Sequence, residues 1–415
     1  MELSRRGLMV NGAAALVMAP LAAQGTAEAA TPTASTSLHQ KLICLDTHLD
    51  TPMSFARTGW DMMQRHGGDI DSTQVDYPRM VEGGLDGGFF AIYTPQAALT
   101  ETGLLAMRDA AFLRAAEIRE LVAAHPDKFE LAFVPEDAAR IAAKGKRIVF
   151  QSIENSSILG HDVSLLRVFY RLGVRMAGPV HFLNNQLGDS ATDAKKWGGL
   201  SPMGKEFVAL ANDLGIVLDA SHASDDVFDQ MSDLSRSAII CSHSGCRAVH
   251  DHPRNLDDAR IKRLAAAGST IQINSYNEYL VTIPPNPERD KAMTAMRSAL
   301  RAKPDASAAE VAKAARDQLV AVRALEKQYP IPRATFETYM QHVTHALDLV
   351  GPDHVGIGAD WDGGGGVIGM EDVSSLPKIT ERLLKAGYTE AQLSNFWGGN
   401  ALRVLGMAQK ARKPA

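Results

Sequence analysis

Short apolar runs that alternate with longer amphipathic stretches constrain the fold of this 415-residue chain more than any other feature. Eight of these runs have the length of buried strands, and most are followed by polar residues. The runs, the second given with the turn that leads into it, lie at residues 42–45, 83–93, 148–153, 176–180, 216–220, 238–241, 270–273 and 355–357. Such alternation is typical of a parallel sheet with crossover helices. The sequence therefore predicts an α/β fold, and its length allows one large α/β barrel as a single domain.

Two segments between these strands have helical character. Residues 107–124 are expected to form a helix whose apolar positions include Leu113, Ile118 and Leu121. Residues 284–332 open with a proline-rich turn and continue in Ala-, Lys- and Arg-rich sequence, which predicts a helical insertion before the last strand. An insertion after a barrel strand lies on the catalytic face, where it would act as a lid or specificity loop. A solvated helix pair, or a contact in a homodimer, is the equally supported alternative.

The first 29 residues have the features of an export signal. Arg5 and Arg6 precede an apolar, Ala-rich segment that ends near Leu21, and Ala-Glu-Ala at 27–29 forms a small-x-small cleavage site. Paired arginines indicate the twin-arginine route. We therefore expect a signal at residues 1–29, a mature domain at 30–415, and a periplasmic or extracellular location in a bacterium. An uncleaved membrane anchor is the alternative, but the run is short for a spanning helix and no later segment is apolar for long enough.

The charge of the chain narrows the class of partner. The formal net charge is −5, and it is unchanged without residues 1–29, because that segment carries as many glutamates as arginines. A mildly acidic chain without a basic tract is not expected to bind nucleic acid. The expected partner is a small-molecule substrate.

Three cysteines, Cys44, Cys241 and Cys246, leave an odd number for pairing. An exported protein of this size does not need disulfides, so at least one is expected to be a buried thiol. Cys241 and Cys246 flank His243, which leaves a disulfide or metal binding open. A small buried cysteine at the end of a strand is the commoner case.

Side chains that can bind metal ions stand at the ends of several predicted strands. His48 and Asp50 follow the first apolar run, and residues two apart in a strand point to the same side. Glu154 ends the third strand, and His222 and His243 stand at the ends of the fifth and sixth. Any one of them is more often a hydrogen-bonded structural residue, but a closed parallel barrel brings all such strand ends to one rim. We therefore predict that these five side chains are metal ligands.

Five ligands are more than one tetrahedral zinc ion requires. If Glu154 bridges, then His48, Asp50 and Glu154 hold one ion, and Glu154, His222 and His243 hold the other. Each ion then has three protein ligands and room for a shared water, which is typical of a catalytic site. Because two cations lower the pKa of this water towards neutrality, the sequence predicts a metal-bridging hydroxide.

A carboxylate after the last strand adds a proton carrier to this prediction. Asp360 follows the strand at 355–357 and precedes a glycine-rich turn, so it is expected on the same rim. From there it can take a proton from the attacking water and pass it to a leaving nitrogen. Capping of the turn is the alternative role for Asp360, and it is the expected role of Asp362.

These residues belong to longer motifs that together resemble the membrane dipeptidase (renal dipeptidase) family of the amidohydrolase superfamily. The similar segments follow one another in the expected order and are His48-Leu49-Asp50, residues 77–84, Ser152-Ile153-Glu154, Ser221-His222, Ser242-His243-Ser244, His252-Pro253-Arg254-Asn255, residues 358–363 and residues 398–404. The resemblance implies a (β/α)8 TIM-type barrel that binds two zinc ions through the five ligands above. It also implies hydrolysis of dipeptides, including those with a D-amino acid at the C-terminal position.

The resemblance assigns roles to two further residues. His181 matches the family's carbonyl-polarising histidine, and an imidazole at a strand end can stabilise an oxyanion. Arg254 matches the arginine that binds the substrate carboxylate, for which the fork of a guanidinium is suited. Without the resemblance, His181 would be interpreted as a structural histidine and Arg254 as a surface residue in a salt bridge.

The chain departs from the family at pocket positions. Leu49 stands where relatives often have a polar residue, and Trp361 replaces a common Phe. Phe182 and Leu183 replace small polar residues of animal relatives. These departures leave the substrate open, and an N-acyl-amino-acid deacylase with the same metals is the leading alternative. A metal- or peptide-binding protein without turnover is another, but Asp360 argues against it, since binding needs no base beside the metals.

Overall fold

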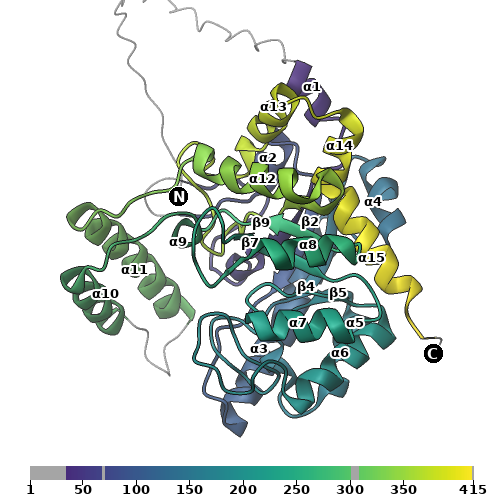
Figure 1. The fold of residues 1–415 in the computed structure, drawn as a ribbon. Coiled ribbons are helices and arrows are strands. Elements are labelled where there is room, and N and C mark those ends of the chain that lie inside the picture. The colour runs from purple at the N-terminus through teal and green to yellow at the C-terminus, as the bar shows by residue number, and fades with distance from the viewer. Residues whose placement is uncertain (1–33, 68–70, 301–307, 414–415) are drawn as a thin grey trace, which may run out of the picture.

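The computed structural model describes residues 34–67, 71–300 and 308–413. The predicted export signal at residues 1–29 lies outside these ranges. The strands are β1 Leu45–Leu49, β2 Gly87–Ile92, β3 Phe129–Leu131, β4 Arg147–Ile153, β5 Val174–Ala177, β6 Val217–Leu218, β7 Ile240–Cys246, β8 Asn255–Leu256, β9 Thr270–Ile273 and β10 Val355–Ile357. The helices are α1 Ala34–His39, α2 Tyr77–Glu82, α3 Glu101–Ala124, α4 Pro135–Ala142, α5 Leu166–Leu172, α6 Pro202–Leu214, α7 Asp225–Leu234, α8 Asp258–Ala266, α9 Asn277–Leu280, α10 Pro287–Ala299, α11 Ala308–Gln328, α12 Phe336–Val350, α13 Pro377–Lys385, α14 Glu390–Ser394 and α15 Asn400–Lys410 (Figure 1).

The strands pair in parallel and form two sheets that meet at both edges. The order is β1-β2-β4-β5-β6 in the first sheet, with β3 beside β4, and β10-β9-β7-β8 in the second. Isolated parallel bridges join the sheets, one between Asp219 and Ile240 and one between Leu49 and Trp361. We call these two junctions, β6 to β7 and β10 to β1, the seams. The α/β fold therefore has a curled parallel sheet that is consistent with a TIM-like barrel.

The eight predicted strands correspond to β1, β2, β4, β5, β6, β7, β9 and β10. Two boundaries differ in a way that matters for the site, because β1 begins where the predicted run ends and β7 continues as far as Cys246. Both strands run on through polar residues because their hydroxyl groups find partners, as where Thr47 Oγ1 donates to the Ser242 carbonyl oxygen at 2.6 Å. His48 and His243 therefore lie within strands rather than after them. The short strands β3 and β8 were not predicted.

Helix α3 begins at Glu101, earlier than the predicted start at residue 107. Thr100 caps it, because its side chain accepts a hydrogen bond from Gly103 N. The buried positions of the helix are Leu104, Met107, Ala111, Ala115 and Ile118. The prediction that Leu113 belongs to the apolar face was wrong, since this side chain is 60% exposed. Small alanines, rather than the large leucine, mark the face that packs closely on the body of the protein.

The chain between β9 and β10 contains the predicted helical insertion. Helices α10 and α11 lie within residues 284–332, and Figure 1 shows them side by side, away from the strands. No residue of α10 is buried. The insertion therefore precedes the last strand of the ring, as predicted, and α10 adds little to the core. Its role as a lid or as a contact in a homodimer stays a prediction.

Alternate residues of the central strands enter two apolar clusters. Phe89 of β2 and Phe150 of β4 stack with ring centroids 4.9 Å apart in the smaller cluster, which the C-terminal helix α15 completes. Their neighbours Phe90 and Val149 belong to the larger cluster. Apolar side chains on both faces are expected of a parallel sheet covered by helices. The strands are thus held from both sides.

Cys44, Cys241 and Cys246 are all buried and free, as expected for buried thiols. The disulfide left open between Cys241 and Cys246 is absent. Both residues lie in β7, and a separation of five strand residues spans about 16 Å, well beyond the reach of a disulfide. Neither cysteine belongs to a group that could hold a metal ion in the described part of the chain.

Candidate metal centre

The predicted metal ligands come from strands of both sheets, and all lie at or near their carboxyl ends. His48 lies in β1 with Asp50 just after it, and Glu154 directly follows β4. His222 follows β6, and His243 lies within β7. Carboxyl ends of parallel strands share one rim in a TIM-like fold, so the curl of the sheet brings these distant residues together. All five side chains are buried.

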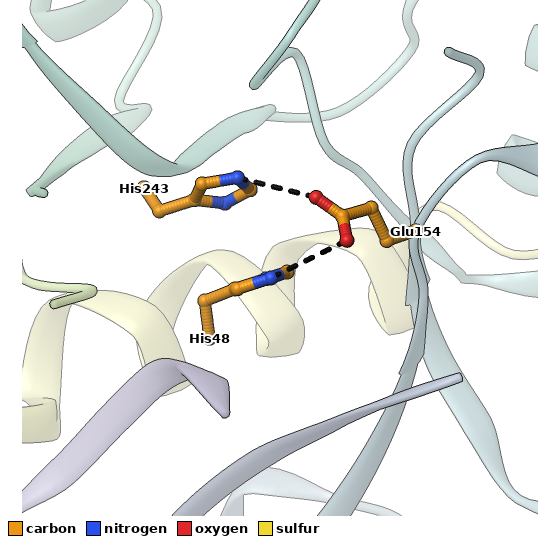
Figure 2. A group of neighbouring side chains, drawn as sticks. All are labelled: His48, Glu154 and His243. Atoms are coloured by element: carbon orange, nitrogen blue, oxygen red, sulfur yellow. Dashed lines mark ion pairs between the residues drawn. The ribbon is translucent and has the colours of Figure 1, made fainter. Parts of the chain in front are cut away.

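The carboxylate of Glu154 stands at the centre of this group. Its Oε2 lies 3.6 Å from His48 Nε2, while its Oε1 lies 3.0 Å from His222 Nε2 and 3.3 Å from His243 Nε2. Asp50 Oδ2 lies 3.6 Å from the same nitrogen of His48. Figure 2 shows His48 and His243 pointing towards the two oxygens of Glu154. The carboxylate therefore faces different ligands with each of its oxygens.

Three overlapping groups of buried side chains in the described residues could each hold a metal ion. They are His48, Glu154 and His243; Glu154, His181 and His222; and His48, Asp50 and Asp360, with ligand atoms that lie within 4.8 Å of one another. Glu154 is shared by two of the groups, which suggests a binuclear metal centre. The geometry brings the five predicted ligands together, and it adds His181 and Asp360 at the same distance. The division of ligands between two ions stays a prediction.

Unpartnered polar atoms provide a test of whether these residues suit a metal ion. Both ring nitrogens of His48, Oδ1 of Asp50 and Nδ1 of His222 are buried without a hydrogen-bond partner among the described residues. A buried polar atom without a partner costs about 1–3 kcal/mol, so such atoms are rare in folded proteins. Nitrogen and carboxylate ligands are those that zinc and similar divalent ions prefer. The residues present therefore fit a metal site.

The electrostatics of the site also favour bound cations. Burial, with Asp50 and Asp360 nearby, raises the pKa of Glu154 to about 7 despite the opposing effect of His48. Burial likewise raises the pKa of Asp360 to about 6. Burial and the charge of Arg254 lower the pKa of His181 to about 3. By contrast, and against the opposing effect of burial, the nearby carboxylates of Glu154 and Asp50 raise the pKa of His48. Divalent cations would offset the negative charge of the crowded carboxylates that stabilises a proton on His48.

Asp360 and His222 adopt a backbone conformation that side chains other than glycine rarely take. Both have φ of 66°, in the left-handed region. This conformation costs about 1–2 kcal/mol and persists where the surroundings hold it, commonly at functional sites. Asn274, which follows β9, donates to Asp360 Oδ2 at 3.4 Å. The loops after β6 and β10 are therefore shaped for the placement of these two side chains.

His181 and Arg254 lie next to the metal-binding group. His181 Nε2 is 3.8 Å from Glu154 Oε1. Arg254 is buried, its Nη2 donates to the His243 carbonyl oxygen at 2.9 Å, and its guanidinium carbon lies 5.0 Å from the ring centroid of Tyr279. Arg254 Nε has no hydrogen-bond partner in the described part of the chain. Arg254 is thus a buried residue beside the site rather than an arginine at the surface.

A cavity of about 130 Å³ opens onto the metal-binding group. Its lining consists of Asp50, Met53, Tyr93, Glu154, His181, Phe182, His222, Tyr276, Tyr279, Asp360 and Gly363. The three tyrosines in this lining were not predicted as site residues, although Tyr93 directly follows β2 and Tyr276 closely follows β9. Their position after strands was the available signal. A wider cavity of about 420 Å³ near Asp189 contains none of the predicted ligands.

Buried histidines and carboxylates at the strand ends of a TIM-like sheet, with one carboxylate shared, define a metal-dependent hydrolase. The chain belongs to the membrane dipeptidase family, peptidase family M19, whose sequence profile matches residues 33–415. It is a metallo-dipeptidase of this family, which confirms the resemblance and the predicted class of enzyme. A dipeptide substrate is implied by the family. Within residues 34–67, 71–300 and 308–413, no helix has the length and apolarity needed to cross a membrane.

Individual relatives agree with this assignment. The chain is 29% identical to Dipeptidase tcpJ of Claviceps purpurea over 338 residues, which cover 80% of this chain and 68% of the relative. It is similar to the crystal structure of the probable dipeptidase PvdM from Pseudomonas aeruginosa, with a TM-score of 0.77, 29% identity, and coverage of 91% of this chain and 98% of the other. A metallo peptidase from Rhodobacter sphaeroides, liganded with a phosphinate mimic of the dipeptide L-Ala-D-Ala, has a TM-score of 0.69 at 22% identity, with 88% and 99% covered. The last comparison shows the shared fold.

Proposed function

We propose that this protein hydrolyses dipeptides at two zinc ions held by His48, Asp50, Glu154, His222 and His243 in a complete (β/α)8 barrel. The observation that carries the proposal is the position of Glu154, whose two oxygens face separate ligands at 3.0 to 3.6 Å. When bound, such a pair of ions supplies an activated water and polarises the substrate carbonyl. The protein's own residues must then bind the substrate, orient it and move protons.

Asp360 is the proposed proton carrier. Its Oδ1 lies 3.9 Å from His48 Nε2, and its Oδ2 accepts from Asn274, so the carboxylate is aimed into the site by its neighbours. From this position it takes the proton of the attacking water and gives it to the leaving nitrogen. His181 lies on the Oε1 side of Glu154 and lines the cavity, where its Nε2 can donate to the developing oxyanion.

Arg254 is the proposed anchor for the free carboxylate of the substrate. Among the described residues, no carboxylate forms a salt bridge with this buried guanidinium, and its Nε is unpartnered. A buried charge without a counter-ion is costly, and a bidentate carboxylate would relieve that cost. Tyr279, whose ring lies 5.0 Å from the guanidinium carbon of Arg254, lines the cavity of about 130 Å³, and a cavity of this size suits a short substrate. Arg254 and the cavity together support a substrate of dipeptide size.

We further propose that the C-terminal residue of the substrate can have the D configuration. The Rhodobacter sphaeroides structure with the same fold holds a phosphinate mimic of L-Ala-D-Ala, which supports this extension. The side chains of Phe182 and Met53 in the cavity favour small or apolar substituents. Stereochemistry and side-chain preference are both tested by a substrate panel.

The test is cleavage by the zinc-loaded protein of L,L- and L,D-dipeptides and of N-acyl amino acids. We expect dipeptides to be cleaved faster, Asp360→Asn to lower kcat by about 100-fold or more, and Arg254→Ala chiefly to raise KM. Arg247→Ala is the matched control, because Arg247 pairs with Asp225 at 2.9 Å outside the metal-binding group and should leave KM unchanged. Faster cleavage of N-acyl amino acids would favour the deacylase alternative. Binding of dipeptides without cleavage would refute hydrolysis altogether.

We also propose export by the twin-arginine route, on the basis of Arg5 and Arg6 and the apolar segment that follows. The test is the location of a reporter fused behind residues 1–33 in a bacterium. Export should be lost when Arg5 and Arg6 are both changed to Lys. A reporter that stays in the cytoplasm with the natural arginines would contradict the proposal.

A further inference from the structure

Two buried aspartates that carry no part of the proposed chemistry lie at the two seams of the sheet. Asp46 is in β1 and Asp219 directly follows β6, and they are 0% and 5% exposed. Each seam has an isolated bridge where the rest of the sheet has a ladder of hydrogen bonds. The seams are therefore the places where backbone pairing alone holds the strands least firmly.

The carboxylate of Asp46 spans the seam between β10 and β1. Its Oδ1 accepts from His48 N at 2.8 Å, and its Oδ2 accepts from Ala359 N at 3.0 Å. The first donor belongs to a predicted metal ligand, and the second immediately precedes Asp360. One buried carboxylate thus connects the backbones that carry His48 and Asp360.

The carboxylate of Asp219 spans the other seam in the same manner. Its Oδ1 accepts from Ser221 N at 3.0 Å and from Ser242 N at 2.9 Å. Ser221 immediately precedes His222, and Ser242 immediately precedes His243. The carboxylate thus connects the backbones of the two histidines that face Oε1 of Glu154.

Asp219 also reaches the imidazole of His243 through a hydroxyl group. Ser242 Oγ donates to Asp219 Oδ2 at 2.5 Å and lies 2.8 Å from His243 Nδ1. Because the hydroxyl proton is directed to the carboxylate, Ser242 Oγ is left to accept from His243 Nδ1. The Nε2 lone pair of His243 is then free to bind a cation.

We infer that Asp46 and Asp219 are positioning residues of the metal centre. Each carboxylate holds together the two strands of one seam by hydrogen bonds, and so fixes the distance between the site residues at the ends of those strands. The inference rests on the proposed dizinc function. Metal sites require ligand positions accurate to about 0.5 Å. At each seam the buried carboxylate accepts hydrogen bonds from two backbone N–H groups. In a continuous ladder these groups would donate to carbonyl oxygens of a neighbouring strand, so the carboxylate takes the place of the missing ladder.

The test compares Asp46→Asn and Asp219→Asn with Asp86→Asn. Asparagine keeps the shape of aspartate but turns one acceptor into an NH2 group. At Asp46 this group would face a backbone N–H, because each oxygen accepts one. At Asp219 it would face the hydroxyl group of Ser242 and reverse that hydrogen bond, because Oδ1 accepts both backbone N–H groups. Asp86 is the matched control, because its Oδ2 also accepts a backbone N–H, from Cys44 at 2.9 Å, but near the amino end of β1. The measurements are zinc retained per chain in competition with a chelator and the visible spectrum of the cobalt-substituted protein.

We expect the variants at the seams to retain at least one zinc ion about 10–100-fold less tightly, with an altered cobalt spectrum. Asp86→Asn should change neither readout. Folded seam variants with wild-type retention and spectrum would overturn the inference, as would an equal loss of zinc in Asp86→Asn. If the seam variants fail to fold, Ser242→Ala removes the hydroxyl group that links Asp219 to His243 but keeps the backbone N–H groups that donate to Asp219. This variant should weaken retention about 10-fold, and unchanged retention in a folded Ser242→Ala chain would likewise overturn the inference.

Metal retention and hydrolysis are separate readouts in this design. A wild-type chain that holds two zinc ions but leaves dipeptides and N-acyl amino acids intact would refute the proposed function. The comparison of Asp46→Asn and Asp219→Asn with Asp86→Asn would still decide the role of the seams in that case.

Discussion

Gly358 provides the sharpest test of how closely the strands meet beneath the metal centre. It follows β10 and precedes Asp360 by two residues. A methyl group built at Gly358 would lie 1.7 Å from the carbonyl oxygen of Ser242 and 2.7 Å from Thr47 Oγ1. Both neighbours are buried strand residues, Thr47 in β1 and Ser242 in β7, so Gly358→Ala should force β10 away from these strands and displace Asp360 with it.

The magnitude follows from which atoms must move. Ordinary contact requires about 3.5 Å, so the backbones must separate by roughly 1.5 to 2 Å. Overpacking that side chains can absorb costs about 1–3 kcal/mol. Here a backbone oxygen has to move, and the hydrogen bond from Thr47 Oγ1 to Ser242 O, 2.6 Å long, adds about 1 kcal/mol when lost. We expect Gly358→Ala to lower the free energy of unfolding by about 3–4 kcal/mol.

The assay is thermal unfolding of the metal-loaded protein, together with dipeptide cleavage by the fraction that stays folded. A loss of this size should lower Tm by roughly 4–5 °C in a chain of this length. Gly406→Ala in α15 is the control, because its methyl group would meet only Pro135 Cγ at 3.4 Å, and Tm should change little. A Gly358→Ala protein that melts within 2 °C of wild type, with normal cleavage, would refute the argument about close strand contact.

Three further outcomes are expected. Glu154→Gln should reduce the content of both metal ions by elemental analysis, because the shared carboxylate loses its charge, whereas Asp50→Asn should affect one ion more than the other. Removal of metal with a chelator should abolish dipeptide cleavage and re-addition of zinc should restore it; activity that survives complete removal would contradict a metal-dependent reaction. Burial lowers the pKa of His342 to about 4, so the unfolded chain takes up a proton between pH 6.5 and 4 that the native state does not. His342 should therefore lower stability by about 2 kcal/mol at pH 5 relative to pH 7.5, and His342→Gln should flatten denaturant-unfolding stability over this range.

Much of the site was predictable because its residues follow a local rule. His48, Asp50 and Glu154 stand at the ends of apolar runs, and the carboxyl ends of parallel strands converge whatever lies between them. The positions of the eight strands followed from the alternation of apolar runs and helices. Boundaries were less accurate where polar residues such as Thr47 continue a strand, since their hydroxyl groups are satisfied by distant parts of the chain.

The sequence by itself determined the α/β class, the order of the strands along the chain and the side chains able to bind metal, because these depend on residue type and near neighbours. The tertiary structure alone decided which oxygen of Glu154 faces which histidine, and that Arg254 is buried without a counter-ion among the described residues. It also decided that Asp46 and Asp219 close the seams. The bond from Ala359 N to Asp46 joins residues 313 positions apart. No local pattern specifies such a contact, since it forms only when the sheet curls and its edge strands meet.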